Sequence, residues 1–100
     1  MTDDRGDDLV VTEDRQSSRY TLSKGGGTPL AVLDYHDNGQ TITVMRVFTA
    51  PPHRGNGYAA RLVEQVVDQI ETRGDRSMAS VCWFASGWFD EHPEHQHLLR

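Results

Sequence analysis

Residues 51–60, PPHRGNGYAA, place two prolines before two closely spaced glycines and then enter an apolar periodic segment. The apolar positions that follow at three- and four-residue steps are Ala59, Leu62, Val63, Val66, Val67 and Ile70. This spacing predicts an amphipathic helix that ends near Gly74. A helix start with so little side chain leaves backbone N–H groups free, and the helix dipole adds partial positive charge. The stretch therefore predicts a site for phosphate oxygens, to which Arg54 can add a cationic donor.

The glycines alone leave other interpretations open. Gly55 and Gly57 can simply form a tight strand-to-helix turn. The segment GNGYAA also fits the dinucleotide fingerprint G-x-G-x-x-A, and Asp75 follows about 20 residues on. However, Pro51 and Pro52 separate the preceding strand from the glycines, and the earlier strands are typical of hairpins, which argues against a dinucleotide fold. No Gly-Lys-Ser/Thr follows the glycines, so the sequence excludes a P-loop.

Four segments before the prolines have the alternation or the β-branched composition of strands: 9–11, 18–23, 30–36 and 40–49. Between the last two, Asn38 and Gly39 predict a hairpin with a type I′ turn. Beyond the helix, residues 77–84 are typical of a further strand, and residues 86–99 of a short helix interrupted at Pro93. This order predicts an α+β fold with the main helix on one face of a largely antiparallel sheet.

Composition limits the function classes. The chain has 100 residues with 36% hydrophobic content, which suits one domain over residues 9–100 after a disordered acidic leader, residues 1–8. The net charge of -5 disfavours nucleic acid as a partner. No long apolar run and no basic, apolar signal segment occur, so we expect a cytoplasmic protein without a membrane partner. Cys82 is the only cysteine, which excludes an internal disulfide and suits a reducing compartment.

Two motifs together indicate a family. RGNGYA, residues 54–59, has the pattern R-x-x-G-x-A, and near the end of the chain CWF at 82–84 is followed by HPE at 92–94. The first motif resembles the acyl-CoA pyrophosphate loop of the GNAT superfamily of N-acetyltransferases. The second pair resembles the C-P-[YF] … H-P-E ending of its short single-domain branch. The resemblance extends from about Ser18 to Leu99, nearly the whole expected domain.

The resemblance implies a GNAT-like mixed, largely antiparallel sheet and an acetyl-CoA site. The residues that it implies around the pyrophosphate are Arg54, Gly55, Asn56, Gly57, Tyr58 and Ala59. It also implies that the strands over 40–49 and 77–84 splay apart, so that backbone groups near Val47, Phe48 and Thr49 receive the pantetheine arm and the thioester. The implied reaction is acetyl transfer to an amine acceptor, a small molecule or a protein, by direct attack.

One departure from the branch keeps other functions open. Its members often carry His-Thr on the strand before the loop, where this chain has Arg46 and Val47. An acyl-CoA-binding module with little or no turnover, and a small interaction domain that has lost the ligand, therefore stay as alternatives. The sequence specifies neither the acceptor nor the oligomeric state.

Cys82 and His92 are the candidate catalytic residues. Cys82 would lie at the end of its strand near the thioester, as a transient acyl acceptor or as an acid for the departing CoA thiolate. The alternative is a small apolar core residue. His92 is a candidate general base because histidine exchanges protons near neutral pH, and its alternative is a residue of a solvated tail.

The tail carries further polar and aromatic groups. His92, His95 and His97 surround Glu94, but Pro93 disrupts the register that a metal site needs, so we expect no metal there. Half of the eight aromatic residues also lie close together, at Trp83, Phe84, Trp88 and Phe89. We expect them in the core and in the lid of the cleft, with an aromatic wall for the acceptor amine as the alternative.

Overall fold

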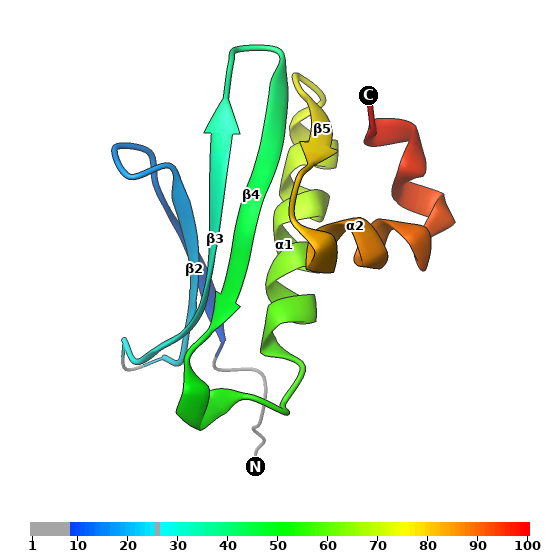
Figure 1. Ribbon diagram of the computed structural model, residues 1–100. Coiled ribbons are helices and arrows are strands. Elements are labelled where there is room, and N and C mark those ends of the chain that lie inside the picture. Colours follow the sequence, from blue (N-terminus) through cyan, green and yellow to red (C-terminus); the bar gives the residue numbers. More distant parts are fainter. Residues whose placement is uncertain (1–8, 26) are drawn as a thin grey trace.

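The computed structural model describes residues 9–25 and 27–100, which form one five-stranded sheet in the order β1-β2-β3-β4-β5 (Figure 1). The strands are β1 (Val10–Asp14), β2 (Arg19–Ser23), β3 (Pro29–Asp37), β4 (Thr41–Thr49) and β5 (Ser77–Ser80). Neighbours from β1 to β4 are antiparallel, whereas β5 pairs with β4 in parallel. The predicted α+β class with a mixed, largely antiparallel sheet is confirmed. The expected leader, residues 1–8, lies outside the described residues.

The main helix, α1 (Tyr58–Arg73), covers one face of this sheet (Figure 1). Its buried residues are Leu62, Val63, Val66, Val67 and Ile70, all of them at predicted positions. They pack with strand residues such as Tyr20, Leu33 and Val44 in a single core. Gly74 ends the helix in the left-handed conformation, with φ at 71°, and donates its N–H to the Ile70 carbonyl at 3.1 Å. The predicted helix and its end are confirmed.

The hairpin between β3 and β4 exists, but its predicted turn type is wrong. A type I′ turn needs positive φ at both Asn38 and Gly39. Gly39 has a φ of 93°, whereas among the described non-glycine residues only Ser18 has a positive φ. The Asn38 side-chain oxygen instead accepts hydrogen bonds from the N–H groups of Gln40 and Thr41, at 2.9 and 2.8 Å. This local bonding gives a wider turn than the two-residue motif.

A β-bulge divides β4 into two halves. Asp34 of β3 pairs with Arg46 and Tyr35 pairs with Val44, so Met45 has no partner across the ladder. Val44 is fully buried, both Met45 and Arg46 are exposed, and Val47 again packs against the core. The extra residue therefore inverts the alternation of side chains. As a result, Arg46 lies on the face opposite α1.

The C-terminal third differs from its prediction. β5 ends at Ser80, four residues before the predicted end, and Trp83 already begins α2 (Trp83–Asp90). The buried residues of α2 are Ala85, Trp88 and Phe89, which is helical spacing, so burial of this face favours a helix over a longer strand. Pro93 does not interrupt one helix but starts a separate 3-10 helix, η3 (Pro93–Leu98). None of the helices in residues 9–25 and 27–100 is long and apolar enough to cross a membrane.

Candidate active site

The site begins where β4 loses one of its two neighbours. β5 pairs with β4 only from Thr41 to Val44, and a last hydrogen bond of 3.0 Å joins the Val81 N–H to the Val44 carbonyl. The chain then turns away into α2, while β3 continues beside β4 as far as Thr49. Among the described residues, no strand pairs with the β5-side edge of β4 beyond Val44. Its backbone groups can therefore bind an extended ligand.

The glycine loop follows directly at the end of this open edge. A short 3-10 helix, η2 (Pro51–His53), leads from β4 to the loop, and the first hydrogen bond of α1 joins the Arg61 N–H to the Gly57 carbonyl at 3.1 Å. No side chain caps α1. Within the described part of the chain, the backbone N–H groups of residues 55–60 have no hydrogen-bond acceptor. A row of free donors at a helix N-terminus suits an anion with several oxygens.

Two glycines give the loop its shape. Gly55 and Gly57 have φ values of 88° and 75°, which L-residues with a side chain rarely adopt. Apart from the glycine and its two chain neighbours, no atom lies within 4 Å of the position that a Cβ would take at either residue. The side-chain amide of Asn56 donates a hydrogen bond to the His53 carbonyl at 3.0 Å and so braces the loop. The surface in front of the free donors is therefore open.

Arg54 and Arg46 both lie against the ring of Phe48, and Arg46 also lies 3.6 Å from an Asp34 carboxylate oxygen of β3. The Arg54 Nε donates a hydrogen bond to the Thr49 carbonyl at 3.3 Å, and its guanidinium carbon lies 5.7 Å from the centre of the Phe48 ring. Arg46 approaches the same ring at 5.2 Å. Both contacts are within the range of cation–π attraction. The ring of Phe48 thus contacts two arginine side chains near the end of β4.

The fold brings all the predicted cofactor-binding residues to one end of the molecule. The open half of β4 ends with Val47, Phe48 and Thr49. The loop and the first turn of α1 contain residues 54–59. Val47 and Tyr58 pack against the core, and Tyr58 lies edge-on to His53 with ring centres 6.4 Å apart. The backbone edge and the free donors are therefore separated only by residues 50–54.

The two candidate catalytic residues lie apart. The prediction that Cys82 lies at the end of a strand is wrong. Cys82 occupies the N-cap position of α2, where it is 8% exposed. His92 follows the other end of α2, which at eight residues is about 12 Å long. The Nδ1 atom of His92 lies 2.6 Å from the Trp88 carbonyl oxygen, and its ring stacks on Trp88 with centres 3.9 Å apart. The structure places Cys82, but not His92, at the point where β5 leaves β4.

Sequence reasoning missed exposed apolar side chains at the same point. Val81 is 68% exposed and Trp83 is 85% exposed, on the segment that leads from β5 into α2. Met45, the unpaired residue of the bulge, is 47% exposed. Trp83 was expected in the core or lid because it stands among aromatic residues, and of that group Trp88 and Phe89 are indeed buried. The exposure of Val81 and Trp83 follows from the end of β5 at Ser80, which the sequence did not predict.

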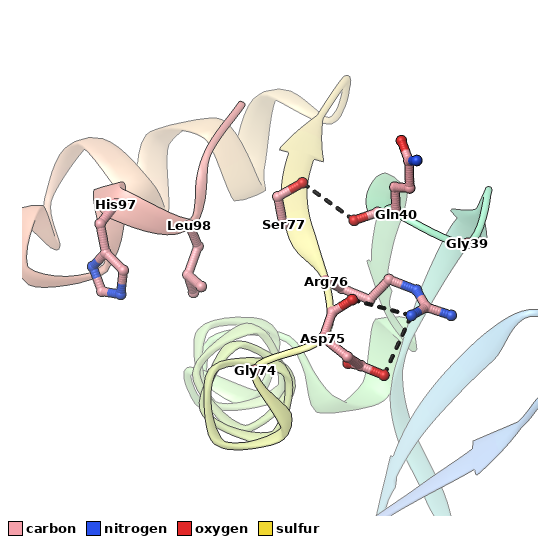
Figure 2. Close-up of a pocket in the computed structure, with 8 residues that line it drawn as sticks. All are labelled: Gly39, Gln40, Gly74, Asp75, Arg76, Ser77, His97 and Leu98. Atoms are coloured by element: carbon pink, nitrogen blue, oxygen red, sulfur yellow. Dashed lines mark hydrogen bonds and ion pairs between the residues drawn. The ribbon is translucent and has the colours of Figure 1, made fainter.

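Surface hollows adjoin the sheet at several places. One, of about 390 Å³, lies on the face opposite α1 and is lined by Arg19, Leu30, Val32, Arg46 and Phe48. Another, of about 360 Å³, lies where β4 and β5 begin, at the opposite end of the sheet from the glycine loop. Figure 2 shows its polar lining, in which the Ser77 hydroxyl donates a hydrogen bond to the Gln40 carbonyl at 3.3 Å. The second hollow is therefore separate from the candidate active site.

Comparison with known proteins agrees with this arrangement. A family model described as GCN5-related N-acetyl-transferase matches residues 19–98. A search of curated proteins finds no match. Among solved structures, a GCN5-like putative N-acetyltransferase from Staphylococcus aureus is 17% identical with a TM-score of 0.68, covering 93% of this chain and 89% of that one.

Two further similar structures contain coenzyme A or acetyl-CoA. N-acetylglutamate synthase from Neisseria gonorrhoeae, complexed with coenzyme A and N-acetyl-glutamate, is 15% identical with a TM-score of 0.57, and the match covers 84% of this chain and 22% of that one. A predicted acetyltransferase from Clostridium acetobutylicum with acetyl-CoA is 14% identical with a TM-score of 0.51, covering 74% and 55% of the two chains. At these identities the likeness shows a shared fold.

Proposed function

The chain belongs to the GCN5-related N-acetyltransferase family, and on this premise we propose that residues 9–100 form one domain that transfers an acetyl group from acetyl-CoA to an amine. The observation that carries the proposal is the placement of two backbone surfaces at one end of the molecule: the open edge of β4 beyond Val44, and the free N–H groups of residues 55–60. Solved structures of the same fold with coenzyme A or acetyl-CoA support it.

In the proposed complex the loop binds the pyrophosphate. The N–H groups of residues 55–60 donate hydrogen bonds to its oxygens. Arg54, beside Phe48, adds a positive charge. The pantetheine arm extends the sheet at Val47, Phe48 and Thr49, replacing the strand that β5 does not supply. Acetyl-CoA supplies the activated acyl group as a thioester.

Catalysis then rests on positioning and on backbone donors. As the neutral amine attacks, an N–H of the open half of β4 donates a hydrogen bond to the thioester oxygen, on which negative charge develops. The new C–N bond forms, the C–S bond breaks, and the amine loses one proton while the thiolate of coenzyme A gains one. Backbone donors fixed in a sheet need no reorganisation for this step, which is why they stabilise the transition state more than water does.

We propose direct attack rather than an acyl-cysteine intermediate. Cys82 is 8% exposed and packs in the core, so its thiol has little room to carry an acyl group. Its place where β5 leaves β4 still allows it to donate a proton to the departing thiolate. His92 lies beyond the far end of α2 from Cys82, so we do not propose it as the general base.

A second candidate function is an acyl-CoA-binding module without turnover. It is favoured by Arg46, which lies against Phe48 where related chains often carry a histidine. The two functions differ in one measurement, the release of free coenzyme A thiol from acetyl-CoA. We expect thiol release that depends on an added amine, tested with small amines and with lysine-containing peptides. Binding of acetyl-CoA without amine-dependent thiol release across such a panel would favour the binding module.

A further inference from the structure

A second cluster of ligand-type side chains lies where residues of η3 contact α1, away from the glycine loop. Asp68 and Glu71 are three residues apart on the last turns of α1 and therefore share one face. The His95 Nδ1 lies 3.0 Å from a Glu71 carboxylate oxygen, and the His95 Nε2 lies 3.9 Å from Asp68. One ligand atom from each of these residues lies within 4.8 Å of the other two. We call Asp68, Glu71 and His95 the α1–η3 cluster.

The histidine of the cluster has an unsatisfied nitrogen. The His95 Nδ1 atom is buried and forms no hydrogen bond with any described residue, although a Glu71 oxygen is close. The contact with Glu71 is thus an ion-pair distance without hydrogen-bond geometry. A buried polar atom without a partner is costly, and a metal ion between a ring nitrogen and the carboxylates removes that cost.

The surroundings favour a cation and hold the ring in place. Glu94 adds a third carboxylate, 3.9 Å from the His95 Nε2. The cluster also lies near the C-terminal end of α1, where the helix dipole contributes partial negative charge. The ring of His95 stacks on Trp88 at 5.6 Å between centres, which restricts its rotation. Three carboxylates therefore surround the His95 ring.

We propose that the α1–η3 cluster binds a divalent transition-metal ion of the Zn²⁺ class, through one nitrogen and two carboxylates. Imidazole and carboxylate together select such ions over Mg²⁺ or Ca²⁺, which prefer oxygen ligands alone. Tetrahedral Zn²⁺ needs ligand atoms about 3.4 Å apart, so Asp68, whose side chain is 56% exposed, has only to rotate inward. The fourth position is left for water or for His97, whose Nε2 lies 2.8 Å from Glu71.

Sequence reasoning sought all the ligands within the tail and therefore expected no metal there. In the structure, Pro93 starts η3 and thereby directs His95 and His97 toward α1, where the carboxylates lie. Bound metal would fix η3 to α1 beside Trp88 of α2. The ion would act on the stability of the C-terminal third, independently of the proposed transfer reaction.

The test is a calorimetric titration of the full, tag-free chain with Zn²⁺, together with thermal melts and Co²⁺ absorption. We expect one ion per chain, a rise in Tm, and an affinity more than about tenfold lower in His95→Gln and in Asp68→Asn. Asp68 is largely exposed, so this variant keeps the fold even where His95→Gln does not. His36→Gln, on the exposed end of β3, is the matched control and should bind as the wild type does.

Three outcomes would overturn the proposal: no Zn²⁺ binding by the wild type at micromolar concentrations, an unchanged affinity in Asp68→Asn, or an equal loss in His36→Gln. The last result would indicate scattered surface histidines rather than a built site.

Discussion

Gly57 does two things at one position. Its φ of 75° turns the chain from the loop into α1, and its missing side chain leaves the donors of the first turn uncovered. A side chain there meets no atom of the protein, so the cost to the fold is limited to the backbone conformation, about 1–2 kcal/mol. The cost to a bound diphosphate is different, because the side chain would occupy the position of the anion.

We therefore expect Gly57→Glu to lower the affinity for coenzyme A at least about a hundredfold, since it adds both bulk and negative charge to an anion site. The measurement is calorimetric titration with coenzyme A. Gly39→Glu is the matched control: it has the same charge change and a similar φ, 93°, but lies in the β3–β4 hairpin at the other end of the sheet. If both variants bind like the wild type, the loop is only a turn.

Cys82 separates direct attack from a covalent route. If the amine attacks directly and Cys82 is not an essential acid, we expect Cys82→Ala to reduce the transfer rate less than about tenfold. Loss of an essential positioned acid would instead reduce it about a hundredfold or more. Cys82→Ser keeps the size of the side chain and controls for packing. The measurement is the rate of acceptor-dependent thiol release, with coenzyme A affinity measured in parallel. A variant that binds coenzyme A normally but has no transfer activity would support the acyl-cysteine route.

At the scale of elements, an ion pair joins the β3–β4 turn to the start of β5. Arg76 precedes β5, and its Nε donates a hydrogen bond to an Asp37 carboxylate oxygen at 2.9 Å. This hydrogen bond holds the pKa of Asp37 below its usual value. The contact fixes the parallel strand at the end where β4 and β5 are paired. Separation of the two strands then occurs only at the far end, where the candidate site lies.

The pKa of Asp37 gives a pH dependence with a definite sign. Because its pKa is lowered in the folded state, the stabilisation is complete above the unfolded pKa, about 3.9, and is lost as the pH falls through the lower folded value. We expect Asp37→Asn to lower the Tm by a few degrees at pH 7 and to match the wild type once the pH falls below the lowered folded pKa of Asp37. Thermal melts across this range are the measurement. If the Tm difference between Asp37→Asn and the wild type is the same at every pH, the loss of stability comes from a changed turn and not from the lost charge.

The sequence was sufficient for elements whose pattern is local. The apolar spacing from Ala59 to Ile70 and the glycine at 74 defined α1, because a helix buries one stripe of its own residues. The end of β5 was not local information: Val81 follows Ser80 in an apolar run, and only the packing of Trp88 and Phe89 decides for α2. Likewise, the bulge at Met45 depends on the register with β3, which no short segment contains.

For the site, the glycine loop was predictable and the geometry around it was not. Positive φ at Gly55 and Gly57 is what a bare loop before a helix suggests. The separation of Cys82 from His92 by the length of α2 follows from that helix, which the sequence placed three residues too late. The partnership of His95 with Glu71 is a contact between distant segments, which spacing within the tail does not reveal.

For the whole molecule, ligand binding should be visible as stability. The free backbone donors of the loop and the open edge of β4 belong to the same sheet and helix that form the only described core. A ligand that bridges them stabilises the folded chain as a unit, because the unfolded chain has no such surface. The size of the effect follows from mass action alone.

We expect acetyl-CoA at about 100 times its dissociation constant to add roughly 2.7 kcal/mol, which raises the Tm of a domain of this size by about 10 °C or more. Coenzyme A should give a comparable shift, because the pyrophosphate and the pantetheine arm are common to both. The measurement is a thermal melt with each ligand and with adenosine diphosphate, which lacks the arm and should give a smaller shift. Equal shifts with adenosine diphosphate and acetyl-CoA would show that the open edge of β4 takes no part. No shift with any of the three would remove the basis for acetyl transfer and favour an interaction domain.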